Sequence, residues 1–419
     1  MPRTPLTRSF ALCAAMLLAT LLLACPQRHA PDSPLEQNAA SVPRIPLAKT
    51  PGLHLVYAVN DPRSVTFGVA RSAHVLIAKP DGSRREILFD YSGFIFHAVP
   101  SPAGTHIAVV GSVWGESGQD ERHLLLYDLA SGSLTDVSAT GFYSRAVQTP
   151  PIFTPDGNWV IFLSRWSVES GEFNIFECEV SSGQIRGLYT DPVEDVPLTM
   201  MPDGRRCIAV RRDPEAISVF EYISVDIETG AVTVLHRFEN VTKVGPAHID
   251  ADENVIYCDI KTSEEGVGPF GGARSREVLS INLDDGTVRS LMEPFTVTYV
   301  YQTFTDADSH RRLLLRRQED IEGEDTPMSR IALSSTDGAD FQYLTDTSAR
   351  SFLLRPPTNI PPIAPDNSLL FFYRQDPAFD FQDIWVMKLD GSDAVNISNT
   401  ASRNEGSAGW IIIPEQPGP

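Results

Sequence analysis

Short apolar runs, each about the length of a β-strand, alternate with glycine turns along the chain from residue 51 onward. Each run leads into an Asp-Gly, Ser-Gly or Thr-Gly pair and then into a second, more polar run. The turn glycines are Gly82, Gly132, Gly183, Gly230, Gly286, Gly338 and Gly391, spaced by 50, 51, 47, 56, 52 and 53 residues. Apolar runs around such turns are typical of β-hairpins, and a repeat of this length is typical of propellers and solenoids.

Each repeat is predicted to contain four strands. The first strand ends in a turn of the Pro-Asp-Gly kind, at residues 102–104, 155–157, 202–204 and 365–367, with Asp-rich variants at 250–252 and 306–308. The second strand is a nearly continuous apolar run, at residues 53–59, 106–110, 159–163, 207–210, 255–258, 313–315 and 369–373. Continuous apolarity indicates a strand that is covered on both faces, as the middle strands of stacked propeller blades are.

The strand count predicts how the ring closes. Only six first strands precede a second strand, and the missing one appears at the far end of the chain, at residues 408–414. We therefore predict an all-β, seven-bladed propeller over residues 51–415, closed by pairing of its N- and C-terminal strands near Leu55 and Trp410. Such closure removes the exposed edge that an open array would leave.

The N-terminal segment is predicted to contain a secretion signal and a lipid anchor. Residues 1–24 have the form of a secretory signal peptide, with Arg3 and Arg8 ahead of an apolar stretch at 10–23. The stretch ends in Leu-Leu-Ala-Cys, which resembles the lipobox of bacterial lipoproteins. That resemblance implies lipidation of Cys25, whereas the alternative is an ordinary secreted protein cleaved nearby.

Residues 25–50 follow this motif and are rich in Pro, Ala, Ser and Gln, so we expect a flexible tether. The residue after Cys25 is Pro26, not the Asp that signals inner-membrane retention in bacterial lipoproteins. We therefore expect an outer-membrane anchor facing the periplasm, in a Gram-negative cell.

Charge excludes some partners and cysteine usage excludes some sites. The formal net charge is -20, and loss of Arg3 and Arg8 with the signal segment makes the chain more negative. Such a surface repels phosphate backbones, so no nucleic-acid partner is expected. Cys178, Cys207 and Cys258 lie far apart in predicted strands and lack the CxxC spacing of zinc or redox sites, so we interpret them as small buried apolar residues.

The repeat resembles the TolB-type, WD-repeat-like propeller blade. The resemblance is strongest in the last blade, at residues 364–367, 369–373 and 383–392, and is also clear at 154–157 and 159–164. It covers roughly residues 51–415. TolB itself has six such blades and a further α/β domain, so the resemblance concerns the propeller alone. It implies a periplasmic protein that binds other proteins through loops or through the funnel at the centre of the ring.

We therefore expect a lipid-anchored, non-enzymatic scaffold or protein-binding propeller, monomeric, without a cofactor, whose partner is an envelope protein. No Gly-x-Ser-x-Gly nucleophile motif is present. The alternative is a carbohydrate-active lyase or hydrolase with a metal in the central channel. Its candidate residues are His97 and His248, which lie in predicted innermost strands. We favour the interpretation that they are two unrelated structural histidines, hydrogen-bonded to the backbone or to water.

Loops between the second and third strands are the other candidate sites. They are long at residues 60–73, 111–122, 259–276 and 317–328, and recognition often resides in such loops. One carries an acidic run made of Glu319, Asp320, Glu322, Glu324 and Asp325. The run could attract a basic partner or a divalent cation, but a solvated surface loop is the favoured interpretation. A Gly-x-Gly-x-x-Gly match at 266–271 lacks the strand and helix that nucleotide binding requires. The Asp-x-Asp pairs at 250–252 and 306–308 are interpreted as turn formers.

Overall fold

The computed structural model describes most of the chain from residue 45 onward, and residues 45–419 form one compact unit. The described ranges are 45–61, 72–114, 120–138, 149–165, 173–194, 196, 198–213, 216, 218–250, 254–262, 276–291, 298–306, 308–319, 328–337, 340–346, 350–352, 361–375, 382–400 and 404–415. The predicted signal segment and Cys25 lie outside them. In these ranges no helix has the length and apolarity needed to cross a bilayer.

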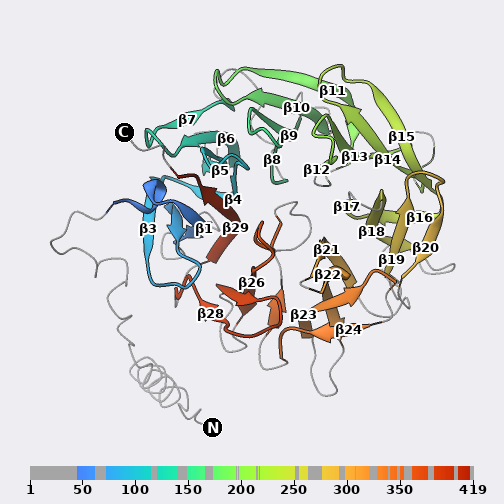
Figure 1. Cartoon of the computed structure of the whole chain (residues 1–419). Coiled ribbons are helices and arrows are strands. Elements are labelled where there is room, and N and C mark those ends of the chain that lie inside the picture. Colours follow the sequence, from blue (N-terminus) through green and yellow to red (C-terminus); the bar gives the residue numbers. More distant parts are fainter. Residues whose placement is uncertain are drawn as a thin grey trace, which may run out of the picture. The chain divides into compact units, whose positions relative to one another are not determined.

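Seven antiparallel β-sheets follow one another around a ring (Figure 1). We call them blades 1 to 7 and call the strands of each blade A, B, C and D from the axis outward. Blade 1 contains β29 (Asn404–Ile413), β1 (Gly52–Asn60), β2 (Ala73–Ala78) and β3 (Arg85–Tyr91). Blade 2 contains β4 (Phe94–Pro100), β5 (His106–Trp114), β6 (Asp120–Asp128) and β7 (Leu134–Asp136). Blade 3 contains β8 (Ile152–Phe153), β9 (Trp159–Arg165), β10 (Phe173–Glu179) and β11 (Ile185–Val193).

The remaining four blades repeat this order, with one irregularity in blade 5. Blade 4 contains β12 (Thr199–Met200), β13 (Arg206–Arg212), β14 (Phe220–Asp226) and β15 (Val232–Phe238). In blade 5 the A strand is divided into β16 (Val241–Val244) and β17 (His248–Asp250), which both pair with β18 (Val255–Thr262), followed by β19 (Arg276–Asn282) and β20 (Val288–Ser290). The sequence pattern did not predict this division.

Blade 6 contains β21 (Thr298–Thr305), β22 (Arg311–Glu319), β23 (Met328–Ser335) and β24 (Phe341–Tyr343). Blade 7 contains β25 (Arg350–Phe352), β26 (Leu369–Gln375), β27 (Gln382–Lys388) and β28 (Val395–Asn396). The A strand of blade 7 resumes after β25 as an isolated bridge between Ile363 and Leu370. Two separate segments of this blade therefore reach toward the axis.

The two ends of the propeller meet in blade 1, as predicted. Strand β29 pairs with β1 in antiparallel register, with Leu55 opposite Trp410 and Gly52 opposite Ile413. A register shift between Tyr57 and Val59 bends the pair. The C-terminal strand thus supplies the innermost position of the first blade, and the ring is closed without a covalent link between its ends.

A short segment before β1 packs against blade 1. The single 3-10 turn η1 (Leu47–Lys49) places Leu47 at 0% exposure, and the Leu47 amide donates to Glu86 Oε2 over 2.7 Å. The Arg84 guanidinium donates to the Ile45 carbonyl over 2.6 Å. The packed unit therefore begins ahead of residue 51, and the last residues of the predicted tether lie on the ring.

Hydrophobic cores fill the spaces between adjacent blades. Between blades 3 and 4, for example, Leu163 and Ile175 pack with Cys207 and Ile223, and all four side chains are fully buried. Burying a side chain of the Leu or Ile type contributes about 1.5–3 kcal/mol. The continuous apolarity of the B strands has the predicted cause, since each B strand faces a neighbouring blade on either side.

The three cysteines of the ring serve this packing. Cys178, Cys207 and Cys258 are free and buried. Burial raises the pKa of each thiol to about 12, so all three stay protonated and behave as small apolar groups.

The turns between A and B strands are held by their aspartates. The Asp203 carboxylate accepts the Arg205 amide over 2.9 Å, and Asp306 accepts the amides of Asp308 over 3.0 Å and His310 over 2.8 Å. In the Asp306 turn, Ser309 takes the left-handed conformation that glycine takes elsewhere, with φ of 66°. Asp306 is therefore a turn former, as interpreted from the sequence.

Candidate functional site

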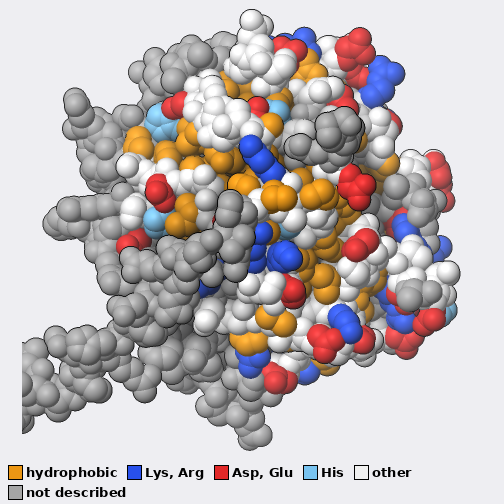
Figure 2. Space-filling view, turned by 60° about the vertical axis from the view of Figure 1, so that its left-hand side comes forward, with side chains coloured by type: hydrophobic (Ala, Val, Ile, Leu, Met, Phe, Trp, Pro, Cys, Tyr) orange, Lys and Arg blue, Asp and Glu red, His pale blue; other side chains and the backbone are white. Residues whose placement is uncertain are grey.

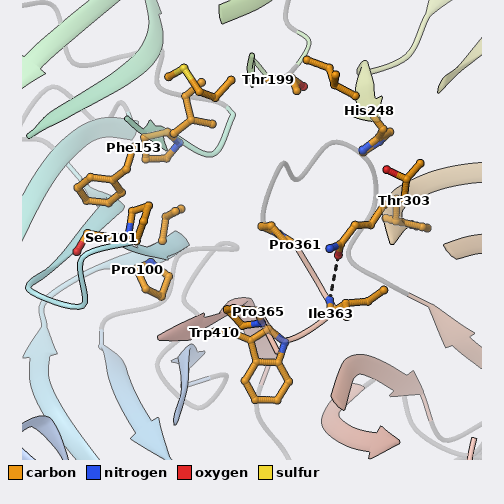
Figure 3. Close-up of a pocket in the computed structure, with 18 of the residues that line it drawn as sticks. Pro100, Ser101, Phe153, Thr199, His248, Thr303, Pro361, Ile363, Pro365 and Trp410 are labelled. Carbon is orange, nitrogen blue, oxygen red and sulfur yellow. Dashed lines mark hydrogen bonds between the residues drawn. The ribbon is translucent and has the colours of Figure 1, made fainter. Parts of the chain in front are cut away.

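A cavity of about 570 Å³ lies on the axis of the ring, and all seven blades contribute to its wall (Figure 3). Its lining comes mainly from A strands and the turns that follow them. The lining residues are Val99, Pro100, Ser101, Pro102, Pro151, Ile152, Phe153, Thr199, Met200, His248, Ile249, Tyr301, Gln302, Thr303, Pro361, Ile363, Pro365, Trp410 and Ile412. In the longest A strands the lining residues are late ones, such as Val99 of β4 and Ile412 of β29. The cavity therefore lies toward the A–B turns.

Prolines and aromatic rings form much of this wall. Pro100, Pro151 and Pro361 face the cavity from three blades. Proline suits the inner edge of a blade because it has no backbone N–H that would need a partner there. The Trp410 indole donates from Nε1 to the Pro362 carbonyl over 2.8 Å, which fixes its ring between blades 1 and 7.

Hydrogen bonds between neighbouring blades hold the wall in shape. Ile363 N donates to Gln302 Oε1 over 3.1 Å, the bond drawn in Figure 3, and joins blade 7 to blade 6. The Thr199 hydroxyl donates to the Ala247 carbonyl over 2.6 Å and joins blade 4 to blade 5. These bonds tie blade 6 to blade 7 and blade 4 to blade 5 around the cavity.

Among the described lining residues, His248 is the single histidine, and its ring points into the cavity (Figure 3). Burial among the surrounding blades lowers its pKa to about 4, so the imidazole is neutral at physiological pH. It makes no hydrogen bond to another described residue. A neutral imidazole offers one donor and one acceptor, and Thr303 lies next to it on the same wall. Phe153 and Pro100 lie across the cavity from this polar wall.

The described residues of the lining include no Asp, Glu, Lys or Arg. Charged side chains of both signs instead lie scattered over the outer surface, as the face shown in Figure 2 illustrates. An unpaired charge that entered the cavity would lose hydration without gaining a counter-charge, which is costly. The wall therefore favours a neutral, largely apolar group with a hydrogen-bonding edge.

His97, the other histidine considered from sequence, lies in β4 opposite Val110. It is not among the lining residues, because the cavity takes the later residues Val99 and Pro100 of that strand. The structure therefore does not bring His97 and His248 together at this cavity. Among the described residues, no group of three His, Cys, Asp or Glu side chains could hold a metal ion.

The acidic run of blade 6 begins at the end of strand β22. Glu319 is the last residue of β22, and Asp320, Glu322, Glu324 and Asp325 lie outside the described residues. Most of the long loops predicted as recognition sites lie outside them as well.

The comparisons with known proteins show the fold. The chain matches no protein-family model, and no curated protein matches it in sequence. The propeller domain of the Trilobed protease from Pyrococcus furiosus is 13% identical, with a TM-score of 0.50 over 72% of this chain and 82% of that one. An oligogalacturonate lyase in complex with manganese is 15% identical, with a TM-score of 0.50 over 84% of this chain and 87% of the other.

TolB from Acinetobacter baumannii is 17% identical, with a TM-score of 0.43 over 70% of this chain. The match spans 63% of that TolB chain, which is less than two thirds of its length. The chain is thus a seven-bladed propeller with distant structural similarity to TolB and to the propellers of peptidases and lyases.

Sequence reasoning missed most of the cavity wall. It identified the A strands but could not tell which of their residues face the axis. Gln302, Trp410 and the ring of prolines had no motif to single them out. The one available signal was the clustering of proline at the start and end of A strands, as at Pro100, Pro102 and Pro151.

Proposed function

We propose that this protein is a non-enzymatic, lipid-anchored propeller of the cell envelope, and that its axial cavity binds a neutral, largely apolar segment of a partner protein. The observation that carries the proposal is the cavity itself, which is lined by all seven blades and, among the described residues, by no charged side chain. The lipobox at Cys25 supports an anchor at the periplasmic face of the outer membrane.

The size and chemistry of the cavity suit this role. Ligand-binding cavities commonly measure about 300–1,000 Å³ and combine apolar walls with a few polar groups, and this one measures about 570 Å³. Burying about 200 Å² of apolar partner surface would contribute about 5 kcal/mol. His248 and Thr303 would hydrogen-bond a peptide group or a hydroxyl, which sets the orientation of the bound segment.

The second candidate function is the channel lyase or hydrolase with a metal. One observation favours it, because His248 is an unpartnered imidazole that faces the axis in a fold shared with a manganese-bound lyase. The donor set argues against it. The described lining offers a single imidazole and no carboxylate or thiol, whereas a metal site of the usual kind takes three or four protein ligands.

Metal analysis of the purified full chain separates the two candidates. The binding proposal expects no stoichiometric transition metal and no change in metal content in His248→Ala or His97→Ala. A metal that is bound one to one and lost in either variant would favour the lyase.

Site-specific photo-crosslinking tests the binding proposal in its natural cell. Ile412 lines the cavity and is 45% exposed, and Val234 on the outer strand β15 is 47% exposed, so the two positions form a matched pair. A photoreactive residue at Ile412 should capture one discrete partner, and the same residue at Val234 should not. Capture from Val234 alone would show that the partner binds the outer strands of the ring, which would contradict the proposal.

The anchor has its own test. Cys25→Ser should release the protein from the membrane fraction while leaving its fold intact, because stable attachment needs the acyl chains. A variant that stays with the outer membrane would show that lipidation at Cys25 is not the anchor.

A further inference from the structure

A buried carboxyl lies where the two ends of the ring meet. Glu405, near the start of β29, is 3% exposed. Its Oε1 accepts a hydrogen bond from the Thr400 hydroxyl, and its Oε2 has no hydrogen-bond partner among the described residues. A buried carboxylate oxygen without a partner is costly when it is ionised. The position therefore calls for a proton on Glu405.

A second carboxyl, Asp383 of blade 7, lies beside the same Thr400 hydroxyl. Asp383 on β27 accepts the Thr400 amide over 3.0 Å, the Ser398 hydroxyl over 3.2 Å and the Asn396 amide group over 2.9 Å. The Thr400 hydroxyl lies 3.5 Å from Asp383 Oδ1. Three donors stabilise Asp383 as a carboxylate, so the two acids face one hydroxyl, and only one of them is well supported in its charged form.

The other titratable groups around Glu405 do not neutralise it. Tyr57 on β1 is fully buried, and its hydroxyl has no hydrogen-bond partner among the described residues. Tyr373 on β26 donates to the Gly406 carbonyl over 2.9 Å. The Arg85 guanidinium on β3 donates to the Ser398 carbonyl.

Two further titratable groups lie on the neighbouring strands. Arg374 lies opposite Asp383 in the β26–β27 ladder, and His97 is the titratable residue of β4, which packs against β29. No cation forms an ion pair with Glu405 among the described residues. Burial, with a smaller contribution from the charge of Asp383, raises the pKa of Glu405 to about 8.

This carboxyl lies on the strand that closes the ring. Gln382 on β27 donates to the Glu405 carbonyl over 3.1 Å, so Glu405 joins blade 7 to blade 1. Further along the same strand, Trp410 and Ile412 line the axial cavity. Any loosening at Glu405 therefore acts on the closure of the ring and on the cavity wall together.

We propose that Glu405 is a proton-controlled latch: while its carboxyl is protonated the contact between blades 7 and 1 is closed, and loss of that proton loosens β29 and the cavity wall it carries. Ionisation places a second negative charge beside Asp383 in a buried site where no described cation forms an ion pair with Glu405. The strain is relieved when the start of β29 separates from blade 7 and water reaches the carboxylate.

The direction of the pH effect follows from the two states. A glutamate in the unfolded chain has a pKa of about 4.5, and in the folded protein the pKa of Glu405 is about 8. The folded state therefore keeps a proton that the unfolded state has lost between these values. The contribution of Glu405 to stability is full below the lower value and is lost as the pH rises through the higher one.

Thermal unfolding of the full chain tests the latch. Glu405→Gln keeps the shape of the side chain and is neutral at every pH. At about pH 5 the Tm of Glu405→Gln should equal that of the wild type. At about pH 9 it should be higher than that of the wild type by about 3 °C or more. A Tm difference that does not change with pH would overturn the proposal.

Hydrogen exchange locates the effect and gives the matched comparison. Amides of β29 should lose protection relative to those of β9 and β10 as the pH rises toward about 9 in the wild type, but not in Glu405→Gln. Glu221→Gln is the control, because Glu221 is 8% exposed and is paired with Arg211 and Arg237. Loss of protection in β10 equal to that in β29 would contradict a latch at the seam.

Two further results keep the proposal testable if Glu405→Gln does not fold. Asp383→Asn removes the neighbouring charge, so the loosening of β29 should begin at a lower pH and cause a smaller fall in Tm. If the pH midpoint of the loosening does not change, the two acids are not coupled.

Added calcium distinguishes a proton latch from a cation site. If millimolar calcium restores the wild-type Tm at about pH 9, the carboxyl pair binds a cation and the proton latch is wrong.

Discussion

The contact between blades 3 and 4 and the contact between blades 7 and 1 solve the same packing problem in different ways. Between blades 3 and 4 the buried part of the interface is a cluster of apolar side chains such as Leu163 and Ile223, and the hydrogen bond from Arg211 to Tyr189 is only part-buried. Between blades 7 and 1 the contact is marked by directed hydrogen bonds from Tyr373, Gln382 and Trp410 to main-chain carbonyls that lie 23 to 48 residues away in sequence.

The difference shows where specificity is needed. Apolar contact is non-directional, so it does not by itself fix the register of a strand that arrives last. Hydrogen bonds to fixed carbonyls do fix it, because they are satisfied in one register only. We define the closing seam as the contact of β29 with β1, β26 and β27. Its hydrogen bonds from Tyr373 and Trp410 are buried, whereas the bond from Arg211 to Tyr189 between blades 3 and 4 is only part-buried.

Removal of β29 is expected to have the largest effect on stability, because it removes the closing seam altogether. Deleting residues 404–419 takes away Ile411 and Ile413 from the core of blades 1 and 2 and exposes the edge of β1. We expect the truncated chain to unfold or aggregate, because an exposed hydrophobic edge pairs with other chains. Circular dichroism melting and light scattering measure this. A truncated chain that melts like the full chain would mean that the ring does not depend on its closing strand.

A buried ion pair tests whether an inner interface tolerates the loss of one partner. Asp250 is 0% exposed and receives the guanidinium of Arg311 from the next blade. Asp250→Ala should cost about 3–5 kcal/mol, because it leaves a charge without its counter-charge in the interface. The control is Glu228→Ala, which breaks the exposed Arg205–Glu228 pair and should cost less than about 1 kcal/mol. Urea unfolding gives both values, and equal costs would show that burial is not the deciding factor.

Two glycine turns compare a position that contacts β29 with a position on the outer edge of a blade. Gly104 and Gly132 have similar positive φ values of 68° and 72°, so alanine is strained at both. At Gly104 the new Cβ would overlap the backbone carbonyl of Ile412 in β29, whereas at Gly132 the nearest atom is the Tyr127 hydroxyl at 3.6 Å. Gly104→Ala should therefore cost about 1–3 kcal/mol more than Gly132→Ala in urea unfolding. Equal losses would mean that β29 shifts freely at its end.

Two tyrosines give the finest comparison. Tyr373 donates to the Gly406 carbonyl across the seam over 2.9 Å, and Tyr222 donates to the Gly245 carbonyl between blades 4 and 5 over 2.8 Å. Each phenylalanine variant loses one buried hydrogen bond, so its free energy of unfolding should fall by about 1 kcal/mol near neutral pH. The seam is closed at that pH, so Tyr373→Phe should cost as much as Tyr222→Phe. A much smaller loss for Tyr373→Phe would indicate a seam that is already open.

The sequence predicts the architecture of this protein well because the repeat is local. Turn glycines and Pro-Asp-Gly motifs specify each hairpin, and counting them predicts the pairing of Leu55 with Trp410. The division of the A strand in blade 5 was not predictable, because the backbone at Gly245 turns against the side chain of Asp259, a tertiary contact.

The candidate site was predicted only in outline. His248 was identified from its place in an A strand, but the same reasoning singled out His97, which lies earlier in its strand and outside the cavity lining. Which inner residues face the axis depends on blade twist and on A strands as short as β8 and β12. Glu405 has no sequence signal, since its importance comes from burial beside Asp383.

The central claim is that the axial cavity binds a neutral segment of a partner, and one charge placed in the wall tests it most directly. Once the partner has been captured, its affinity should be measured for the wild type, Ile412→Lys and Val234→Lys. We predict that Ile412→Lys weakens binding about tenfold or more, because it puts an unpaired cation into the cavity. Val234→Lys leaves the cavity unchanged and should not weaken binding. Equal affinities for all three proteins would contradict it.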